Sequence, residues 1–153
     1  MIKQMNVLRA ADYPRMPWKN GGGSTEEITR DSGSGLDGFG WRLSIADIGE
    51  SGGFSTFAGY ERIISVLQGD GMTLTVDGQA TRSLHPLDPF AFSGESHVTC
   101  TLLGGAIRDF NLIYAPKRYP RTVAVDGRPA AVFQRGGDGV GVQCRSGVSY
   151  QDR

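Results

Sequence analysis

The chain has 153 residues, 39% of them hydrophobic, and its 16 basic side chains balance its 16 acidic ones. This length is sufficient for one domain with a real core, and the balanced charge argues against nucleic acid or an anionic membrane as a partner. No apolar run approaches the roughly 20 residues that span a bilayer, and the N-terminus lacks the apolar core of a signal peptide. The two cysteines, Cys100 and Cys144, form neither a disulfide framework nor a metal-ligand spacing. We therefore expect a cytoplasmic protein.

The first thirty residues predict short strands separated by breaks. Residues 2–10 alternate loosely and predict an edge strand, whereas two prolines predict an irregular stretch over residues 13–18. Lys19 precedes a run of three glycines, which is the wrong order for a phosphate-binding loop. These glycines instead predict a turn into a strand over residues 24–30.

Residues 41–48 predict a strand with two different faces. Trp41, Leu43 and Ile45 share one face by the period of two. The other face carries Arg42, Ser44 and Ala46, so it is small and polar with one cation. That second face either meets solvent or lines a cavity.

Residues 54–78 predict the central hairpin of the fold. A strand over residues 62–67 is followed by Gly69-Asp70-Gly71 and a second strand over residues 72–76. The two glycines supply the positive φ angles that a reversal requires. We expect four buried side chains here: Ile64, Val66, Leu74 and Val76.

Further short strands are predicted over residues 90–93, 97–103 and 107–114, with turn signals between them and no amphipathic helix. This spacing is typical of an all-β sandwich or barrel, and an antiparallel jelly roll fits it best. From residue 115 the pattern changes, because prolines, glycines and arginines interrupt it. Only residues 122–125 and 130–133 predict strands there, so we expect a weakly structured or partner-dependent tail. Residues 136–153 should contribute little to folding.

Five separated motifs give the chain a family resemblance. It is similar to the HutD/Ves family of cupins in residues 16–23, 39–46, 54–57, 61–62 and 108–112. The resemblance implies a cupin-type β-barrel in a cytoplasmic bacterial protein associated with histidine utilisation, acting as a metabolite-sensing regulator. Family members continue with a longer, strand-rich C-terminal part, from which this chain departs after Tyr114. We therefore expect a barrel over residues 1–115, and a tail or truncated second barrel half over residues 116–153.

The resemblance also predicts that the barrel holds no metal and no other cofactor. In metal-binding cupins the first motif carries two His and a Glu, and the Glu position, seven residues before Gly69, falls on Arg62. A cation would repel a divalent metal there. His97 matches the last ligand position, but one His cannot hold a catalytic metal, which needs about three protein ligands.

Arg62 has the parity of Ile64 and Val66, so it should face the barrel interior. A buried guanidinium needs either an internal carboxylate or an anionic ligand. The internal candidates are Glu26, Glu27, Glu61 and Asp109. The alternative is a carboxylate receptor, because the planar fork of arginine matches a carboxylate through two hydrogen bonds.

The predicted ligand-binding residues are Arg62, Asn111, Ser44, Phe57, Trp41 and Phe92. Asn111 and Ser44 would add polar contacts, and the aromatic residues would wall the pocket, together with Trp18 and Phe110. We expect a metal-free protein that binds a small carboxylate metabolite such as formylglutamate or urocanate. The sequence leaves open whether the protein forms a homodimer.

The alternative is a metal-independent cupin isomerase or lyase acting on a similar acid. Acid–base chemistry would fall to residues that titrate near neutral pH. The candidates are His97, Glu26, Glu27 and Asp109, and the sequence shows no pairing among them.

Overall fold

A computed structural model of the protein describes residues 8–31, 33, 35, 38–117, 121–125, 130–135 and 138–143. Within these residues the chain is built of β-strands, apart from one short 3-10 turn, η1 (Ala10–Asp12). The predicted all-β class is confirmed. No helix in this part of the chain is long and apolar enough to cross a membrane.

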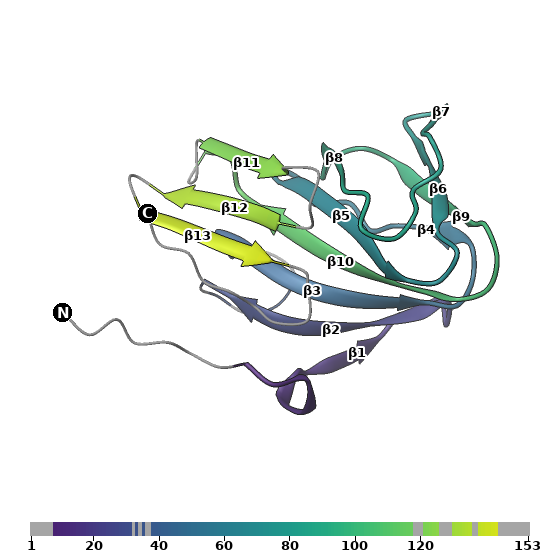
Figure 1. The fold of residues 1–153 in the computed structure, drawn as a ribbon, viewed down its shortest axis with the longest axis horizontal. Helices are drawn as coiled ribbons and strands as arrows, with labels where there is room; N and C mark the ends of the chain where they lie inside the picture. The colour runs from purple at the N-terminus through teal and green to yellow at the C-terminus, as the bar shows by residue number, and fades with distance from the viewer. Residues whose placement is uncertain are drawn as a thin grey trace.

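The strands form three antiparallel sheets (Figure 1). The six-stranded sheet has the order β1 (Arg15–Pro17), β2 (Gly23–Arg30), β3 (Trp41–Ile48), β10 (Ile107–Tyr114), β5 (Glu61–Gln68) and β8 (Phe90–Ser93). The four-stranded sheet has the order β4 (Gly52–Gly53), β9 (Val98–Leu102), β6 (Met72–Val76) and β7 (Gln79–Ala80). The three-stranded sheet consists of β11 (Arg121–Val125), β12 (Ala130–Arg135) and β13 (Asp138–Gln143).

Most strand predictions agree with these bounds, and the N-terminal region differs in two places. The predicted strand over residues 2–10 lies mostly outside the described residues, and its last residue, Ala10, begins η1. Residues 15–17, predicted as irregular, form β1, where Pro17 pairs with Ser24. The prolines are tolerated because β1 is an edge strand, which needs hydrogen bonds on one side only.

The predicted central hairpin is wrong in its pairing. β5 lies between β10 and β8, whereas β6 lies between β9 and β7, so the two strands belong to different sheets. The turn between them has the expected positive φ angles, 101° at Gly69 and 100° at Gly71. It therefore carries the chain from one sheet to the other. The period of two predicts that a strand has a buried face, but it does not say which strand lies beside it.

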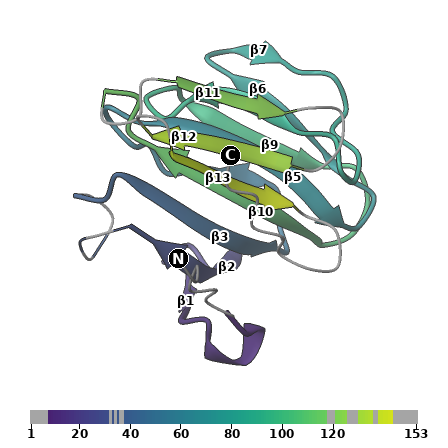
Figure 2. The same ribbon diagram turned by 60° about the vertical axis from the view of Figure 1, so that its left-hand side comes forward.

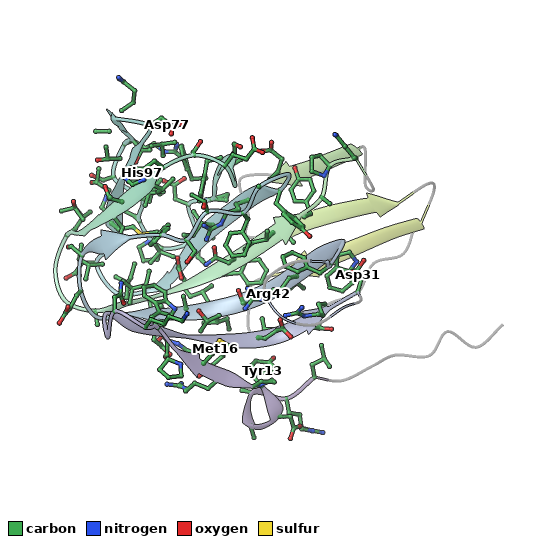
Figure 3. All side chains as sticks on the ribbon, turned by 180° about the vertical axis from the view of Figure 1, so that it is seen from behind. Tyr13, Met16, Asp31, Arg42, Asp77 and His97 are labelled. Carbon is green, nitrogen blue, oxygen red and sulfur yellow. The ribbon has the colours of Figure 1, made fainter. Side chains whose placement is uncertain are left out.

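The main core lies between the six-stranded and four-stranded sheets. Ile64, Val66 and Leu74 are fully buried in it, as predicted, whereas Val76 is only partly buried at its margin. A second apolar cluster, the outer cluster, lies on the opposite face of the six-stranded sheet and consists of Leu43, Ile63, Phe110 and Leu112. The sheet β11–β13 stands in front of the six-stranded sheet in Figure 1 and behind it in Figure 3, and Figure 2 shows its strands across β5 and β10.

The tail contains more strand than the sequence predicts. β11 and β12 correspond to the two predicted segments, whereas β13 lies where no strand was predicted. In β13, glycine alternates with valine, and Val140 and Val142 lie opposite Phe133 and Ala131 of β12. The glycines signalled a loop and masked the alternation of the valines. The proposed boundary at residue 115 stays a prediction.

Candidate functional site

A cavity of about 430 Å³ lies inside the barrel. Its walls come from β1, β2, β3, β4, β5, β10, the turn between β1 and β2, and the segment that joins β4 to β5. The lining residues are Met16, Pro17, Trp18, Lys19, Asn20, Thr25, Arg42, Ser44, Ala46, Ile48, Gly53, Phe54, Ser55, Phe57, Arg62, Asp109, Asn111 and Ile113. The cavity thus combines an apolar wall with a few converging polar groups, as small-molecule sites do.

Strand parity decides which side chains reach this cavity. On β3 the even-numbered residues Arg42 and Ser44 line it, and on β10 the odd-numbered residues Asp109 and Asn111 do so. The register places Asn111 opposite Ser44 of β3 on one side and opposite Ile64 of β5 on the other. The polar groups of three strands therefore meet on one surface.

Arg62 is the central cation of the cavity and is only 7% exposed. Its Nη2 donates to Asn111 Oδ1 (2.8 Å), and its Nη1 donates to the backbone carbonyl of Ser55 (3.2 Å). Its buried Nε has no hydrogen-bond partner among the described residues. One edge of the guanidinium therefore has an unused donor.

Three phenyl rings surround the guanidinium of Arg62. Its central carbon lies 5.6 Å from the ring centroid of Phe54, 5.3 Å from that of Phe57 and 5.0 Å from that of Phe92. Such cation–π contacts stabilise a partly desolvated cation. Burial lowers the pKa of Arg62 to about 10, so the side chain stays charged at neutral pH.

No internal carboxylate neutralises Arg62 directly. In the part of the chain that the structure describes, none of the four candidates forms an ion pair with it within 4.0 Å; these are Glu26, Glu27, Glu61 and Asp109. Glu26 pairs with Arg15, and Glu27 pairs with Arg42 instead. The predicted alternative of a direct internal salt bridge is therefore not found there.

Among the described residues, Asn111 links Asp109 to Arg62 by hydrogen bonds. Its Oδ1 accepts a long hydrogen bond from Asn111 Nδ2 (3.4 Å), and its Oδ2 is buried without a partner among the described residues. Asp109 is 0% exposed. Burial raises the pKa of Asp109 to about 7, although the charge of Arg62 and the hydrogen bond from Asn111 act to lower it.

Arg42 is a second buried guanidinium on the cavity wall, as Figure 3 shows in the middle of the molecule. Its Nε lies 2.7 Å from Glu27 Oε1. Burial acts to raise the pKa of Glu27, but hydrogen bonds from Arg30 and Arg42 bring it below its usual value. Glu27 is thus ionised and shared between two arginines. With Lys19 at the rim, the lining carries three cations against the single carboxyl of Asp109.

The structure brings most of the predicted site residues together. Arg62, Asn111, Ser44 and Phe57 line the cavity, and Phe92 lies beneath the guanidinium. Trp41 does not join them, because it packs against the outer cluster on the opposite face of the sheet. It lies on the same strand as Ser44 with opposite parity, so the two cannot face one cavity. Phe110 belongs to the outer cluster for the same reason.

Arg42, Asp109 and Phe54 lie beside Arg62 or on the same polar wall of the cavity, and none of them was among the predicted ligand-binding residues. Arg42 shares the parity of Ser44, and Asp109 shares that of Asn111, so alternation along each strand was a sufficient signal. Phe54 precedes the first predicted strand of the central segment, in irregular chain where parity gives no guidance.

The cavity residues do not fit the metal that the first cupin motif often holds. Two guanidinium groups and one carboxyl line it, and the described residues contain no group of three or more His, Cys, Asp or Glu that could hold a metal ion. His97 is exposed near one end of the molecule, where its backbone N–H donates to Asp77 Oδ1 (2.8 Å; Figure 3). The lining of this cavity therefore does not suit that metal.

An antiparallel barrel with a polar cavity between its sheets is the architecture of a cupin domain. A cupin-2 domain from Rhodospirillum rubrum shares this fold, with a TM-score of 0.52 at 15% identity, over 75% of this chain and 78% of that one. This likeness concerns the fold alone.

The chain belongs to the HutD family, whose model matches residues 10–152. It is 80% identical over 118 residues to a Pseudomonas putida protein described as a 21.2 kDa protein in the hutC 3' region, covering 77% of this chain and 62% of that protein. It is 37% identical over 137 residues to Protein Ves of Escherichia fergusonii, covering 82% and 68% of the two chains.

A solved structure of HutD from Pseudomonas fluorescens SBW25, described as a formate condition, is 73% identical with a TM-score of 0.70. The match covers 74% of this chain and 61% of that one. This chain thus spans about three fifths of the length of its Pseudomonas relatives.

Proposed function

We propose that this chain binds a small carboxylate metabolite in the barrel cavity, without a metal, and that binding serves the control of histidine utilisation. The observation that carries the proposal is Arg62. A buried, charged guanidinium faces the cavity, has a free Nε donor and has no carboxylate partner within ion-pair distance among the described residues. An uncompensated buried cation is costly, and a ligand carboxylate would supply the missing charge.

The surroundings of Arg62 suit a carboxylate. The three phenyl rings hold the guanidinium plane in place, and the hydrogen bonds to Asn111 and Ser55 fix its rotation. The free Nε–H, together with an Nη–H that leaves its present partner for the ligand, would form the two parallel donors that a carboxylate matches.

The pathway rests on the relatives. One Pseudomonas relative is described by its place beside hutC, and another was solved in a formate condition. We propose formylglutamate or urocanate as the ligand, as expected from the sequence. Arg42 gives the cavity a second guanidinium, so we expect formylglutamate, which has two carboxylates, to bind more tightly than urocanate, which has one.

Two measurements test this proposal. Protein purified from its native host would be denatured, and the released small molecules identified by mass spectrometry. Calorimetric titration with formylglutamate, urocanate and formate would then rank the acids, with an amine such as histamine as the control of opposite charge. Binding of the acids but not of the amine supports the proposal, whereas binding of none of the acids contradicts it.

A metal-independent isomerase or lyase is the second candidate, and Asp109 favours it. Its pKa of about 7 is suited to general acid–base work near neutral pH. However, Asp109 is 0% exposed, so a bound substrate would need side-chain movement to reach it. Proton NMR of formylglutamate or urocanate incubated with the protein would detect turnover, and unchanged spectra would leave binding as the function.

A further inference from the structure

The carboxyl of Asp109 is a second unsatisfied group on the wall of the same cavity. It is completely buried, and its Oδ2 has no partner among the described residues. Its Oδ1 accepts a long hydrogen bond from Asn111 (3.4 Å), and the backbone N–H groups of Ala46 and of Asp109 itself also favour the ionised form. One oxygen of an ionised carboxylate in this position would still lack the hydrogen bond that normally stabilises a buried charge. The binding of a carboxylate to Arg62 does not use this group.

Asp109 depends on Arg62 to stay ionised. The other charged or titratable groups around it are Arg62 on β5, Arg42 on β3, which lines the same cavity, and the Cys100 thiol on β9 of the facing sheet. Burial and the nearby Asp109 raise the pKa of Cys100, so the thiol is neutral. Arg42 already forms an ion pair with Glu27. Arg62 is therefore the main charge that favours the anionic form of Asp109.

A carboxylate bound to Arg62 would remove that support. It would neutralise the guanidinium and place a second negative charge in the same cavity, and like charges raise the pKa of a carboxyl. Asn111 can accommodate the change because it carries both a donor and an acceptor. Once Arg62 turns to the ligand, Asn111 Oδ1 is free to accept a hydrogen bond from protonated Asp109.

We propose that the cavity takes up a carboxylate together with one proton, and that Asp109 accepts this proton from solvent. This inference rests on the proposed function. It makes Asp109 a residue that sets the strength and pH dependence of binding without contacting the ligand. Binding then weakens as the pH rises above the pKa of Asp109 in the free protein, because the concentration of free protons falls and each binding event consumes one.

Calorimetry in two buffers counts the protons. The parent chain would be titrated with formylglutamate at pH 8 in Tris and in triethanolamine, which differ in ionisation enthalpy and carry no carboxylate. We expect an uptake of about half to one proton per ligand, because Asp109 is mostly ionised at that pH before binding. We also expect affinity to fall by up to about tenfold per pH unit above pH 8.

Two variants assign the proton to its residue. Asp109→Asn keeps the shape of the side chain but cannot ionise, so it should bind with no proton uptake and with little pH dependence. Asp47→Asn is the matched control, because Asp47 lies on the outward side of β3 and contacts Arg108 rather than the cavity. It should retain the uptake of the parent.

The outcomes separate the two proposals. Binding with equal heats in both buffers, once corrected for dilution, overturns the role of Asp109 and leaves the carboxylate site standing. If Asp109→Asn takes up as many protons per ligand as the parent, the role of Asp109 is overturned as well. If the parent binds no carboxylate at all, both proposals fail. If Asp109→Asn does not fold, the parent chain still tests the proposal. Heats that differ between the two buffers and an affinity that falls above pH 8 support it, and the absence of both overturns it.

Discussion

Arg62, Asn111 and Asp109 form one hydrogen-bonded chain, and their charges depend on one another. The guanidinium donates to the amide oxygen, and the amide nitrogen donates to the carboxyl. The opposite charges at the ends are separated by a neutral residue, so neither compensates the other fully. Burial lowers the pKa of Arg62 and raises that of Asp109, and the attraction between the two charges offsets only part of each shift.

Replacing Asp109 with asparagine should change the pH dependence of stability. The carboxyl of the folded protein has a pKa of about 7 against an ordinary value of 3.8, so folding stability falls as the pH rises from about 4 to about 7. Asparagine removes that loss. Asp109→Asn should match the parent near pH 4 and exceed its stability at pH 8 by on the order of 2–4 kcal/mol. Urea unfolding across this range measures the difference, and parallel profiles would contradict the raised pKa.

The absence of a metal is a second prediction at this scale. Protein purified without chelators should carry no stoichiometric zinc, iron, manganese or nickel, because Arg62 stands where a metal-binding cupin carries a carboxylate ligand. Elemental analysis of the purified chain checks this. A content near one metal per chain would overturn it.

Single residues were predictable from the sequence wherever strand parity applied. The inward orientation of Arg62 followed from its spacing to Ile64 and Val66, and the shared face of Arg42 and Ser44 followed from the period of two. The pairing of Arg62 with Asn111 depends on the register between β5 and β10, which brings together residues 49 positions apart. Local patterns carry no information on such long-range register.

At the scale of elements, the turn between β5 and β6 directs the chain from one sheet to the other. Gly71 has a φ of 100°, and a Cβ there would lie 2.2 Å from the backbone oxygen of Leu84. Neither the backbone angle nor the space suits another residue. The glycines in the sequence revealed the turn, but the pairing of β6 with β9 depends on residues far along the chain.

Gly71→Ala should therefore destabilise the domain, by about 2 kcal/mol or more, because it combines backbone strain with a clash against main-chain atoms. Gly105→Ala is the matched control, since a Cβ at Gly105 meets nothing within 4 Å and its φ is not in the positive range. Chemical denaturation of both variants gives the comparison. Equal stabilities would show that this corner tolerates a side chain.

At the scale of the whole molecule, the six-stranded sheet has an apolar face on each side. The inner face lines the core and the cavity, and the outer face carries the outer cluster, of which Leu112 is fully buried. A sheet with two apolar faces needs a covering layer on both sides. The figures show β11–β13 on one side of this sheet.

Two truncations should separate the roles of the C-terminal strands. Ending the chain after Phe133 removes the last two residues of β12 and all of β13. The thermal midpoint should stay within a few degrees, since the glycine and arginine content of the removed segment predicts little apolar burial. Ending it after Lys117 removes all three strands and should expose the outer cluster, with a larger loss of stability and increased binding of a hydrophobic dye. Thermal melts with dye fluorescence distinguish the two. If the chain that ends after Phe133 loses its fold, β13 is an integral part of the domain.

Calorimetric titration of formylglutamate into the parent chain and its Arg62 variants, paired with thermal melts, tests the carboxylate receptor most directly. Arg62→Ala should stay folded and lose on the order of 2–5 kcal/mol of binding, about 30-fold or more in affinity. Arg62→Lys should also bind poorly, because lysine keeps the charge and loses the fork. Unfolding of Arg62→Ala, or destabilisation by roughly 3–5 kcal/mol, would instead indicate that Arg62 serves the fold through its internal contacts. A folded Arg62→Ala that binds as tightly as the parent would contradict the assignment of Arg62 as the carboxylate receptor.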